Sequence, residues 1–320
     1  MSQLMFNRSL TVEIINEAYT ITCSDFSIDF DITLTGEAEY NTARISIRNL
    51  SEQSRTDIAD TIKKGIRKLK VWGGYTGFST TMTAMDIDLG FVPGEMLFYG
   101  DLVKIKNRKE PLGWITEIEA LDGYDSIKQL SYVKTWKAGT PIQAILLDMC
   151  GSIGLPIDPG FLPLTQVLKK SASYNDPVST VLNKICKAFN LKWAIIHGVL
   201  EINNKDTPLL SAATQVVKLT PDTGLIGSPE LMVDESPESG EPTGSIIATS
   251  LLNGKLIPKR PVLILPTNPM SFAGIELAKQ KRLSGFNVAA KGIYLIDTVH
   301  HSGNNRSGQF HTEITCPIWQ

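Results

Sequence analysis

The sequence has few cysteines, no strong excess of one charge and no long apolar run. Its cysteines, Cys23, Cys150, Cys186 and Cys316, form no CxxC pair, so we expect reduced, buried thiols in a protein made in a cytoplasm. The 31 basic and 33 acidic residues give a formal net charge of −2, which argues against binding a phosphate backbone by charge. No apolar run approaches the roughly 20 residues of a membrane helix, and no signal peptide is recognisable.

Motifs of common catalytic sites are also missing. The sequence contains no GxSxG elbow, P-loop or HExxH motif, and GGYTG at 73–77 lacks the strand, glycine loop and helix of a dinucleotide site. Glu117 and Glu119 are two residues apart in a strand pattern, which is typical of a solvated ladder of carboxylates. A pair of catalytic carboxylates distant in the chain stays open as an alternative, but we expect no enzyme activity and no cofactor.

Three of the four histidines lie close together near the C-terminus. A hairpin could bring His311 opposite His300 or His301. Asp297 shares a face with His301, so the candidate metal ligands are His301, His311 and Asp297. Neighbouring residues of a strand point to opposite faces, however, so His300 and His301 cannot both reach one ion without a bulge. We therefore expect polar residues at the end of a hairpin, with its turn in SGNNRSG (302–308), and no metal site.

The first third of the chain has the two-residue period of β-strands. Alternate apolar residues in 26–35 mark one face of a long strand. After the strand pattern ARISIRNL, Asn49 or Ser51 can cap a helix, and Glu52 lies three residues after Asn49 as in a capping box. A Gly-, Thr- and Ser-rich segment at 76–95 then predicts a long loop that interrupts the strands.

The middle third has the period of amphipathic helices. Apolar residues recur at i, i+3 and i+4 in 140–156 and in 175–189, and Asp176 precedes Pro177 as an N-cap precedes the first helical residue. The pattern WAIIHGVLEI then predicts a hairpin. Strand patterns return in the last third, where an acidic, Pro- and Ser-rich segment at 234–244 indicates a second flexible loop.

A chain of 320 residues exceeds the usual size of one compact core, so several domains are expected. The change of period along the sequence predicts a mainly β protein with a smaller α+β part. We expect a first β domain at 1–125, a small α+β module at 126–205 and a second β domain at 206–320. The loops at 76–95 and 234–244 are expected to be the most mobile segments.

Several stretches, taken in order, resemble baseplate hub proteins of tailed bacteriophages. In the N-terminal third these are FSIDFDITLTGEAEYNTARISIRNLSEQSR, LKVWGGYTG, LFYGDLVKI and ITEIEALDGYDSIK. In the C-terminal third they are GSPELMV, IIATSLLNGKLIPKRPVLIL and GIYLIDTVHHSGNNRSGQFHTEITC. The sequence departs from the family pattern at Lys259 and Arg260, where a PG turn is common, and at Asn304 and Phe310, where Asp and Trp are common. These departures affect turns and packing more than the fold.

The resemblance implies a structural virion protein of the tail baseplate. In such hubs two tail-tube-like β-barrel domains flank a small α+β module, and a homotrimer forms a ring between the sixfold tail tube above and the threefold central spike below. Other baseplate proteins surround the ring, and DNA passes through it without sequence-specific binding. A near-neutral or acidic wall would let DNA pass, so the basic groups in 63–70 and 104–109 are expected to face neighbours or solvent. Asn49 and Ser51 would then be caps at a scaffold joint.

Three other interpretations stay open. The hub of a phage-tail-like bacteriocin or of a secretion machine has the same sequence pattern, and capsid and packaging genes near its gene would separate the two cases. A wall-degrading tail enzyme would release fragments from peptidoglycan. A carbohydrate-binding adhesin would need clustered aromatic side chains, whereas the five tryptophans are scattered along the chain.

Overall fold

The computed structural model describes residues 7–38, 40–63, 65–75, 94–128, 130–157, 166–204, 216–234, 243–266, 271–272 and 292–317. The expected loops at 76–95 and 234–244 lie almost wholly outside these residues. Their expected mobility therefore stays a prediction.

The first part of the chain is mainly β. Its elements are β1 (Arg8–Asn16), β2 (Thr20–Cys23), β3 (Ile28–Thr35), β4 (Thr42–Arg48), α1 (Glu52–Thr61), β5 (Arg67–Tyr75), β6 (Glu95–Glu110), β7 (Gly113–Leu121) and α2 (Tyr124–Lys128). Burial alternates along β3 and β4, so every second side chain enters the core, as the two-residue period predicts.

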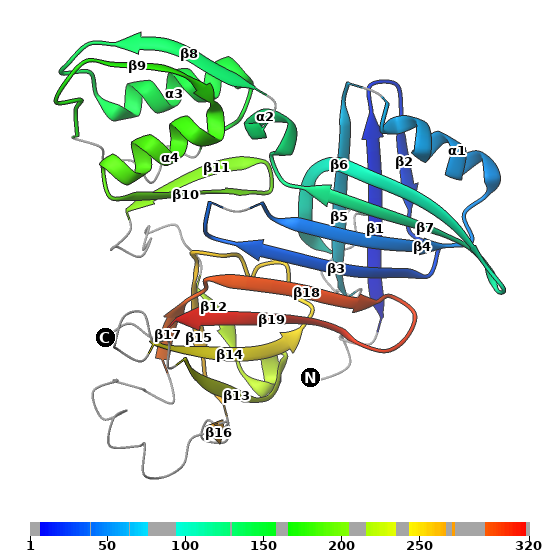
Figure 1. The fold of residues 1–320 in the computed structure, drawn as a ribbon. Coiled ribbons are helices and arrows are strands. Elements are labelled where there is room, and N and C mark those ends of the chain that lie inside the picture. Colours follow the sequence, from blue (N-terminus) through cyan, green and yellow to red (C-terminus); the bar gives the residue numbers. More distant parts are fainter. Residues whose placement is uncertain are drawn as a thin grey trace, which may run out of the picture.

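The middle part is an α+β unit, which we call the module. It consists of β8 (Ser131–Trp136), α3 (Ile142–Ile153), β9 (Ala172–Pro177), α4 (Val178–Ala188), β10 (Leu191–Ile196) and β11 (Val199–Asn204). The predicted apolar stripes are buried: Ile142, Ile145, Leu146 and Met149 in α3, and Val178, Val181, Leu182 and Ile185 in α4. Figure 1 shows the module to one side of the large sheet. Among the described residues, no helix is long and apolar enough to cross a membrane.

The last part returns to β structure. Its elements are β12 (Val217–Leu219), the short 3-10 helix η2 (Pro221–Thr223), β13 (Leu225–Asp234), β14 (Thr243–Leu251), β15 (Pro261–Ile264), β16 (Ser271–Phe272), β17 (Gly292–Leu295), β18 (Thr298–Asn304) and β19 (Phe310–Pro317). Strands β12, β15 and β17 form a small sheet of their own.

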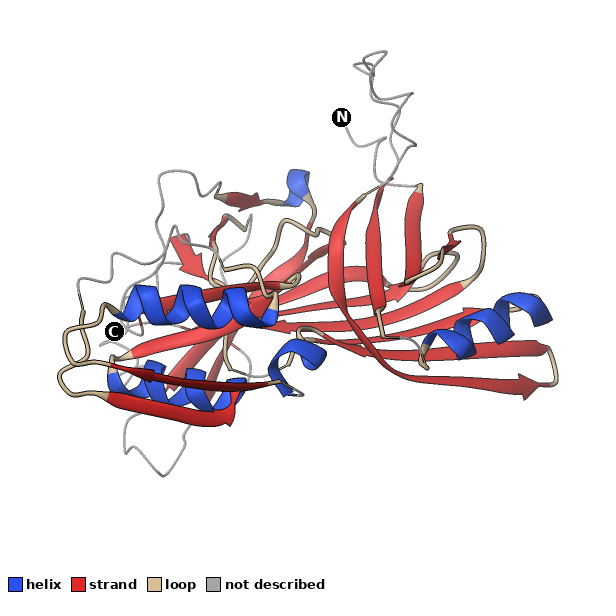
Figure 2. Ribbon diagram, turned by 90° about the horizontal axis from the view of Figure 1, so that it is seen from above, coloured by secondary structure: helices blue, strands red, loops and turns tan. Residues whose placement is uncertain are grey.

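Within the described residues, the two β regions share one twelve-stranded sheet. Its order is β16-β13-β14-β19-β18-β3-β4-β7-β6-β5-β1-β2. The regions meet at β3 and β18, which run antiparallel from the pair Thr35–Thr298 to the pair Asp29–Asn304. Both ribbon views show strands dominating the molecule, with the helices at its margins (Figures 1 and 2). The prediction of a mainly β chain with a smaller α+β part is confirmed.

Two apolar cores lie in the described residues. The first contains side chains from both β regions, including Val12, Phe98, Ile246 and Ile314. The second extends from Ile127 to Ile202 and belongs to the module and the short helix before it. The β regions therefore form one body by packing, and the module forms another. The domain bounds at 125 and 205 stay a prediction.

Candidate functional surface

One face of the large sheet is polar where β19, β18, β3, β4, β7 and the outer part of β6 (104–110) lie side by side. Side chains alternate along each strand, so the residues between the core positions all point to this opposite face. Strand pairing aligns them in rows, one made of Asn304, Asp29, Ser46, Glu117 and Lys106, the next of Ser302, Asp31, Arg44, Glu119 and Lys104. We call this surface the polar sheet face.

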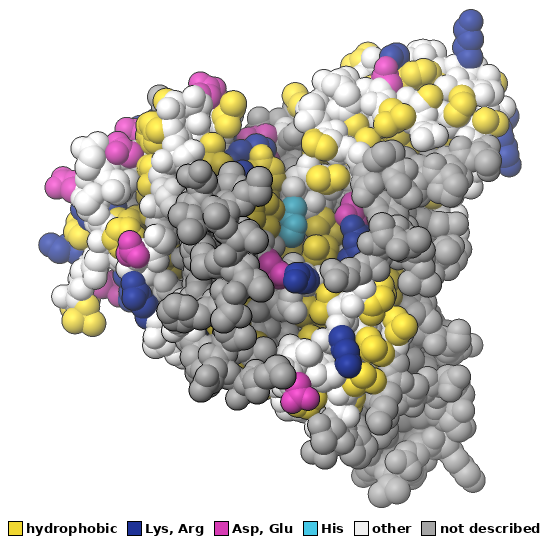
Figure 3. All heavy atoms as spheres, turned by 180° about the vertical axis from the view of Figure 1, so that it is seen from behind, with side chains coloured by type: hydrophobic (Ala, Val, Ile, Leu, Met, Phe, Trp, Pro, Cys, Tyr) yellow, Lys and Arg dark blue, Asp and Glu magenta, His cyan; other side chains and the backbone are white. Residues whose placement is uncertain are grey.

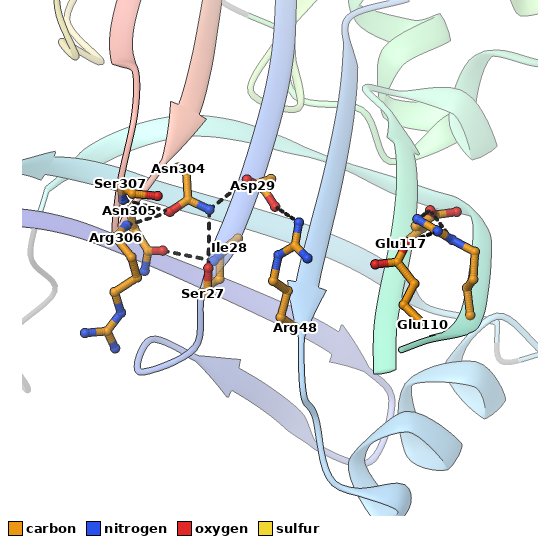
Figure 4. Close-up of polar contacts among 11 residues, drawn as sticks. Ser27, Ile28, Asp29, Arg48, Glu110, Glu117, Asn304, Asn305, Arg306 and Ser307 are labelled. Carbon is orange, nitrogen blue, oxygen red and sulfur yellow. Dashed lines mark hydrogen bonds and ion pairs between the residues drawn. The ribbon is translucent and has the colours of Figure 1, made fainter. Parts of the chain in front are cut away.

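Acidic and basic side chains of the polar sheet face pair with one another (Figure 4). The N···O distances are 3.2, 3.1 and 2.9 Å in the pairs Arg48–Asp29, Lys104–Glu119 and Arg108–Glu117. These side chains are 35% to 60% exposed, so solvent screens each pair and it adds little to stability. The pairs therefore matter mainly for the charge that the surface presents.

The polar sheet face has a formal charge of −1 when its histidines are neutral. It carries five basic and six acidic residues: Arg44, Arg48, Lys104, Lys106 and Arg108, and Asp29, Asp31, Glu110, Glu117, Glu119 and Glu313. Because the two signs are interspersed, a phosphate backbone would meet attraction and repulsion in nearly equal measure. Charged side chains are also scattered among the coloured residues of the reverse view, without a broad patch of one sign (Figure 3).

The turn between β18 and β19 fastens one end of the polar sheet face. Asn304 donates from Nδ2 to Asp29 Oδ1 at 2.7 Å (Figure 4). The neighbouring Asn305 accepts a hydrogen bond from Ile28 N at 2.9 Å. Gly303 has a φ of 148°, which a side chain would disfavour. The turn therefore connects the two β regions by side-chain contacts in addition to the strand pairing.

The candidate metal ligands have separate partners. His301 is buried on the core face, where its Nδ1 shares a 2.8 Å hydrogen bond with a threonine hydroxyl of β19. Burial chiefly lowers the pKa of His301 to about 3, so its imidazole is neutral. His311 lies on the polar sheet face, 3.4 Å from Ser302 Oγ, and Asp297 pairs with Lys259 at 2.6 Å. Within the described residues, no group of three or more His, Cys, Asp or Glu side chains could hold a metal ion.

Residues at the joint between β4 and α1 have two different roles. Ser51 is the N-cap of α1, and its Oγ accepts a hydrogen bond from Ser54 N at 3.0 Å. Asn49 instead has a left-handed backbone, with φ at 59°, and its N–H donates to Trp114 O at 2.8 Å. The expected Asn49–Glu52 capping box is therefore wrong. Ser51 is the N-cap, and the N–H of Asn49, which the box would have used, donates to β7 instead.

The expected cap at Asp176 is also corrected. Asp176 lies within β9, opposite Tyr132 of β8, and the N-cap of α4 is Pro177, which makes no side-chain cap. The Asp176 carboxylate accepts a hydrogen bond from Lys184 Nζ at 2.6 Å. Strand β9 includes Pro177 and the helix begins at Val178, so Asp176 lies one residue before the N-cap position.

A polar junction joins the module to both β regions, and no sequence pattern indicates it. Asp122 Oδ1, just after β7, accepts a hydrogen bond from Gly198 N at 3.0 Å. Three residues further along the same hairpin, the Arg260 guanidinium donates to both carboxylate oxygens of Glu201, at 2.6 and 3.1 Å. The dipeptides DG at 122–123 and HG at 197–198 indicate turns, but nothing in them shows that the two turns meet.

No known protein-family model matches this sequence, and no curated protein matches it either. Solved structures do. A tail protein from Neisseria meningitidis MC58 aligns with a TM-score of 0.59 and 9% identity, covering 98% of each chain. The chain has the fold of phage tail proteins. The 43 kDa tail protein of prophage MuSo2 from Shewanella oneidensis aligns with a TM-score of 0.57 and 10% identity over 97% of each chain.

The phage tail fold also occurs in secretion machinery. The E. coli protein c3393 is a component of the type VI secretion system with structural similarity to the T4 bacteriophage tail proteins gp27 and gp5. It aligns with a TM-score of 0.54 and 11% identity, over 96% of this chain and 77% of that one. Identities this low establish the fold alone. At that level the resemblance to tail and baseplate proteins, first seen in short motifs, is confirmed.

Proposed function

We propose that three copies of this chain form a baseplate hub, a ring that joins a sixfold tail tube to a threefold spike and lets DNA pass. The observation that supports it most is the continuous sheet through β3 and β18, which places two β regions side by side in one chain. Three chains would supply six such regions, matching a sixfold tube, while keeping threefold symmetry. The hub would act in the virion tail, in contact with tube, spike and other baseplate proteins, and without a cofactor.

The polar sheet face suits the wall of the channel. Its near-zero charge would let DNA slide past without being held. Basic residues of the outer part of β6 were expected to point away from such a wall, yet Lys104 and Arg108 lie on this face beside Glu119 and Glu117. In this proposal, the basic groups lie on the wall, and their pairing with carboxylates keeps them from binding phosphates.

Light scattering on the purified chain, across a dilution series, tests the ring. The expected mass is three times the 35.1 kDa of one chain, and electron microscopy should show rings with a lumen wide enough for a duplex. A protein that stays monomeric at every concentration, both alone and with tail-tube protein, would contradict the proposal.

The charge of the wall can be tested with a double substitution. Glu117→Gln with Glu119→Gln raises the charge of the polar sheet face by two without changing side-chain size. We expect this variant to bind a labelled duplex with a clear salt dependence between 50 and 200 mM salt, where the natural chain binds weakly. The matched control is Asp57→Asn with Asp60→Asn, which makes the same charge change on α1. Equal DNA binding by both variants would show that the polar sheet face is not the wall.

A second candidate function is the hub of a secretion machine, favoured by the likeness to c3393. Both hubs would join a tube to a spike, and they differ in that the phage hub would also let DNA pass. Capsid and packaging genes beside the gene for this chain would support the phage hub. Secretion genes there, without capsid and packaging genes, would support the second candidate.

We also propose that the chain does not cleave the cell wall. Glu117 and Glu119, the two carboxylates that the sequence singled out, both form ion pairs with basic residues of β6, an arrangement that suits a surface ladder. Purified protein incubated with peptidoglycan should release no soluble fragments, and release above that of a heat-denatured sample would overturn this part of the proposal.

A further inference from the structure

The module meets the large sheet at the turn between β10 and β11. His197 and Gly198 both have left-handed backbones, with φ at 53° and 79°, as a two-residue hairpin turn requires. A side chain at Gly198 would start 2.5 Å from the ring of Tyr99 on β6. The turn is therefore in close contact with the sheet, and only glycine fits at its second position.

Asp122 lies beneath this turn with one oxygen bonded and one oxygen unpaired. Its Oδ1 accepts the hydrogen bond from Gly198 N, whereas its Oδ2 is buried and has no hydrogen-bond partner in the described part of the chain. The whole residue is 1% exposed. Burial raises the pKa of Asp122 to about 8, against the opposing effect of hydrogen bonds from the turn and from Asn41. The carboxyl group is therefore protonated at neutral pH while the turn covers it.

Charged groups near Asp122 do not offset its burial. Asp101 of β6 raises the pKa of Asp122 further, and Asp101 is itself paired with Lys68 of β5. Among the described residues, no lysine or arginine forms an ion pair with Asp122. On the turn, His197 Nε2 lies 3.3 Å from Leu97 O, and burial lowers the pKa of His197. At the turn itself, Asp122 and His197 are therefore both in their uncharged forms at neutral pH.

The module can separate from the sheet without breaking either apolar core. Its core extends from Ile127 to Ile202, and the core of the β regions has no side chain from the module. Asn41 Nδ2, which donates to Ile195 O at 2.6 Å, and the Arg260–Glu201 pair are further polar contacts across the junction. Movement of the module would therefore exchange these polar contacts, together with the contact of the turn with Tyr99, for water, and each polar contact so exchanged costs little.

We propose that the module docks on the large sheet reversibly and in a pH-dependent manner, with the β10–β11 turn held against β6 by the uncharged form of Asp122. This inference does not depend on the hub function. It describes a built-in adjustment of the angle between the module and the sheet, controlled by a single carboxyl group.

The direction of the pH effect follows from proton linkage. When the turn lifts, Asp122 meets water and its pKa returns toward the ordinary value of 3.8. Between roughly pH 4 and 8 the docked form holds a proton that the undocked form has lost, so docking weakens as the pH rises, by up to about tenfold per pH unit. Above pH 8 this effect levels off. His197 acts in the opposite direction below pH 6.5, so only the Asp122 effect operates between pH 6.5 and 8.

Hydrogen exchange measured by mass spectrometry tests the proposal, because exchange detects rare openings. After correction for the intrinsic rate, amides of the β10–β11 hairpin should lose protection between pH 6.5 and 8, by up to about tenfold per unit at the lower end of this range. In the Asp122→Asn variant, which mimics the protonated carboxyl group in shape and charge, their protection should stay constant over the same range. Peptides from β8 and β14 serve as controls for unfolding of the module and of the sheet, and should not respond in either protein.

Three results would overturn the proposal. One is constant protection of the hairpin in the natural chain from pH 6.5 to 8. Another is an equal loss in the Asp122→Asn variant, which would assign the effect to another group. A natural chain that loses protection in β8 or β14 to the same extent as in the hairpin would show general unfolding in place of undocking, and would also contradict the proposal.

Discussion

The joint between the two β regions differs in kind from the joint between the module and the sheet. The β regions share a ladder of backbone hydrogen bonds along β3 and β18 and a single apolar core. The rings of Phe30 and Phe310 meet across that joint at 5.5 Å and nearly at right angles. The module has a core of its own and contacts the sheet through a few polar atoms, such as those of Asp122 and Arg260.

The two joints differ in how much free energy it costs to open them. Burial of apolar surface contributes about 25 cal/mol per Å², and it is lost at once if the two β regions separate. A hydrogen bond between neutral groups contributes only about 1 kcal/mol net, because water replaces the partner. The structure therefore combines a rigid double β unit, as a ring component would need, with a module whose position can be adjusted at modest cost.

The strongest test of the rigid joint is Phe30→Ala. This change removes the ring that packs on Phe310 from the other β region, and we expect a loss of about 4 kcal/mol in the free energy of unfolding. Because the core is shared, hydrogen exchange should accelerate in β1 and in β14 together. Phe30→Leu, the control, should cost much less. Loss of protection in only one β region would show that the two regions are not one cooperative unit.

The matching test within the module is Leu182→Ala. Leu182 of α4 is fully buried in the second core, so its truncation should destabilise the module by about 3 kcal/mol. Protection should fall in α3, α4 and β8 and stay unchanged in β1 and β14. If the sheet lost as much protection as the module, the two cores would be coupled more tightly than their separate packing indicates.

Local patterns predicted the helices and strands well, because the spacing of apolar residues that buries one face of an element is set by residues close together in the sequence. The period of two in 28–35 and the apolar stripes of α3 and α4 are all found in the structure. The cap at Ser51 also follows from neighbouring residues. At Asn49 and Asp176 the motif matched but the backbone did not, since each residue is held by a more distant partner, Trp114 and Lys184.

Contacts between distant segments could not be predicted in this way. The pairing of Ile32 with His301 joins strands from opposite ends of the chain, and no periodicity encodes which edge a strand will find. The polar sheet face depends on that pairing, because its rows exist only once five or more strands are in register. The bond between Asp122 and Gly198 likewise connects two turns that each look ordinary in the sequence.

The buried ion pair of the module junction can be tested with Arg260→Met. Glu201 has a side chain only 7% exposed, so loss of Arg260 leaves a carboxylate with poor solvation. We expect docking of the module to weaken by about 2 kcal/mol, less than for a fully buried pair because Arg260 is partly exposed. The double variant Arg260→Met with Glu201→Leu should recover most of the loss. The readout is exchange in the β10–β11 hairpin, and a double variant as weak as the single one would rule out the buried charge of Glu201 as the cause.

The smallest effect is expected for Lys192→Ala, which removes an exposed ion pair at the same junction. Lys192 pairs with Glu37 between the module and the first β region, but the two side chains are 32% and 48% exposed. Solvent screens such a pair, so docking should weaken by less than about 0.5 kcal/mol. The same hairpin amides report the result, and Lys192→Met controls for the aliphatic part of the side chain. An effect as large as that of Arg260→Met would mean that burial does not decide which polar contacts hold the module in place.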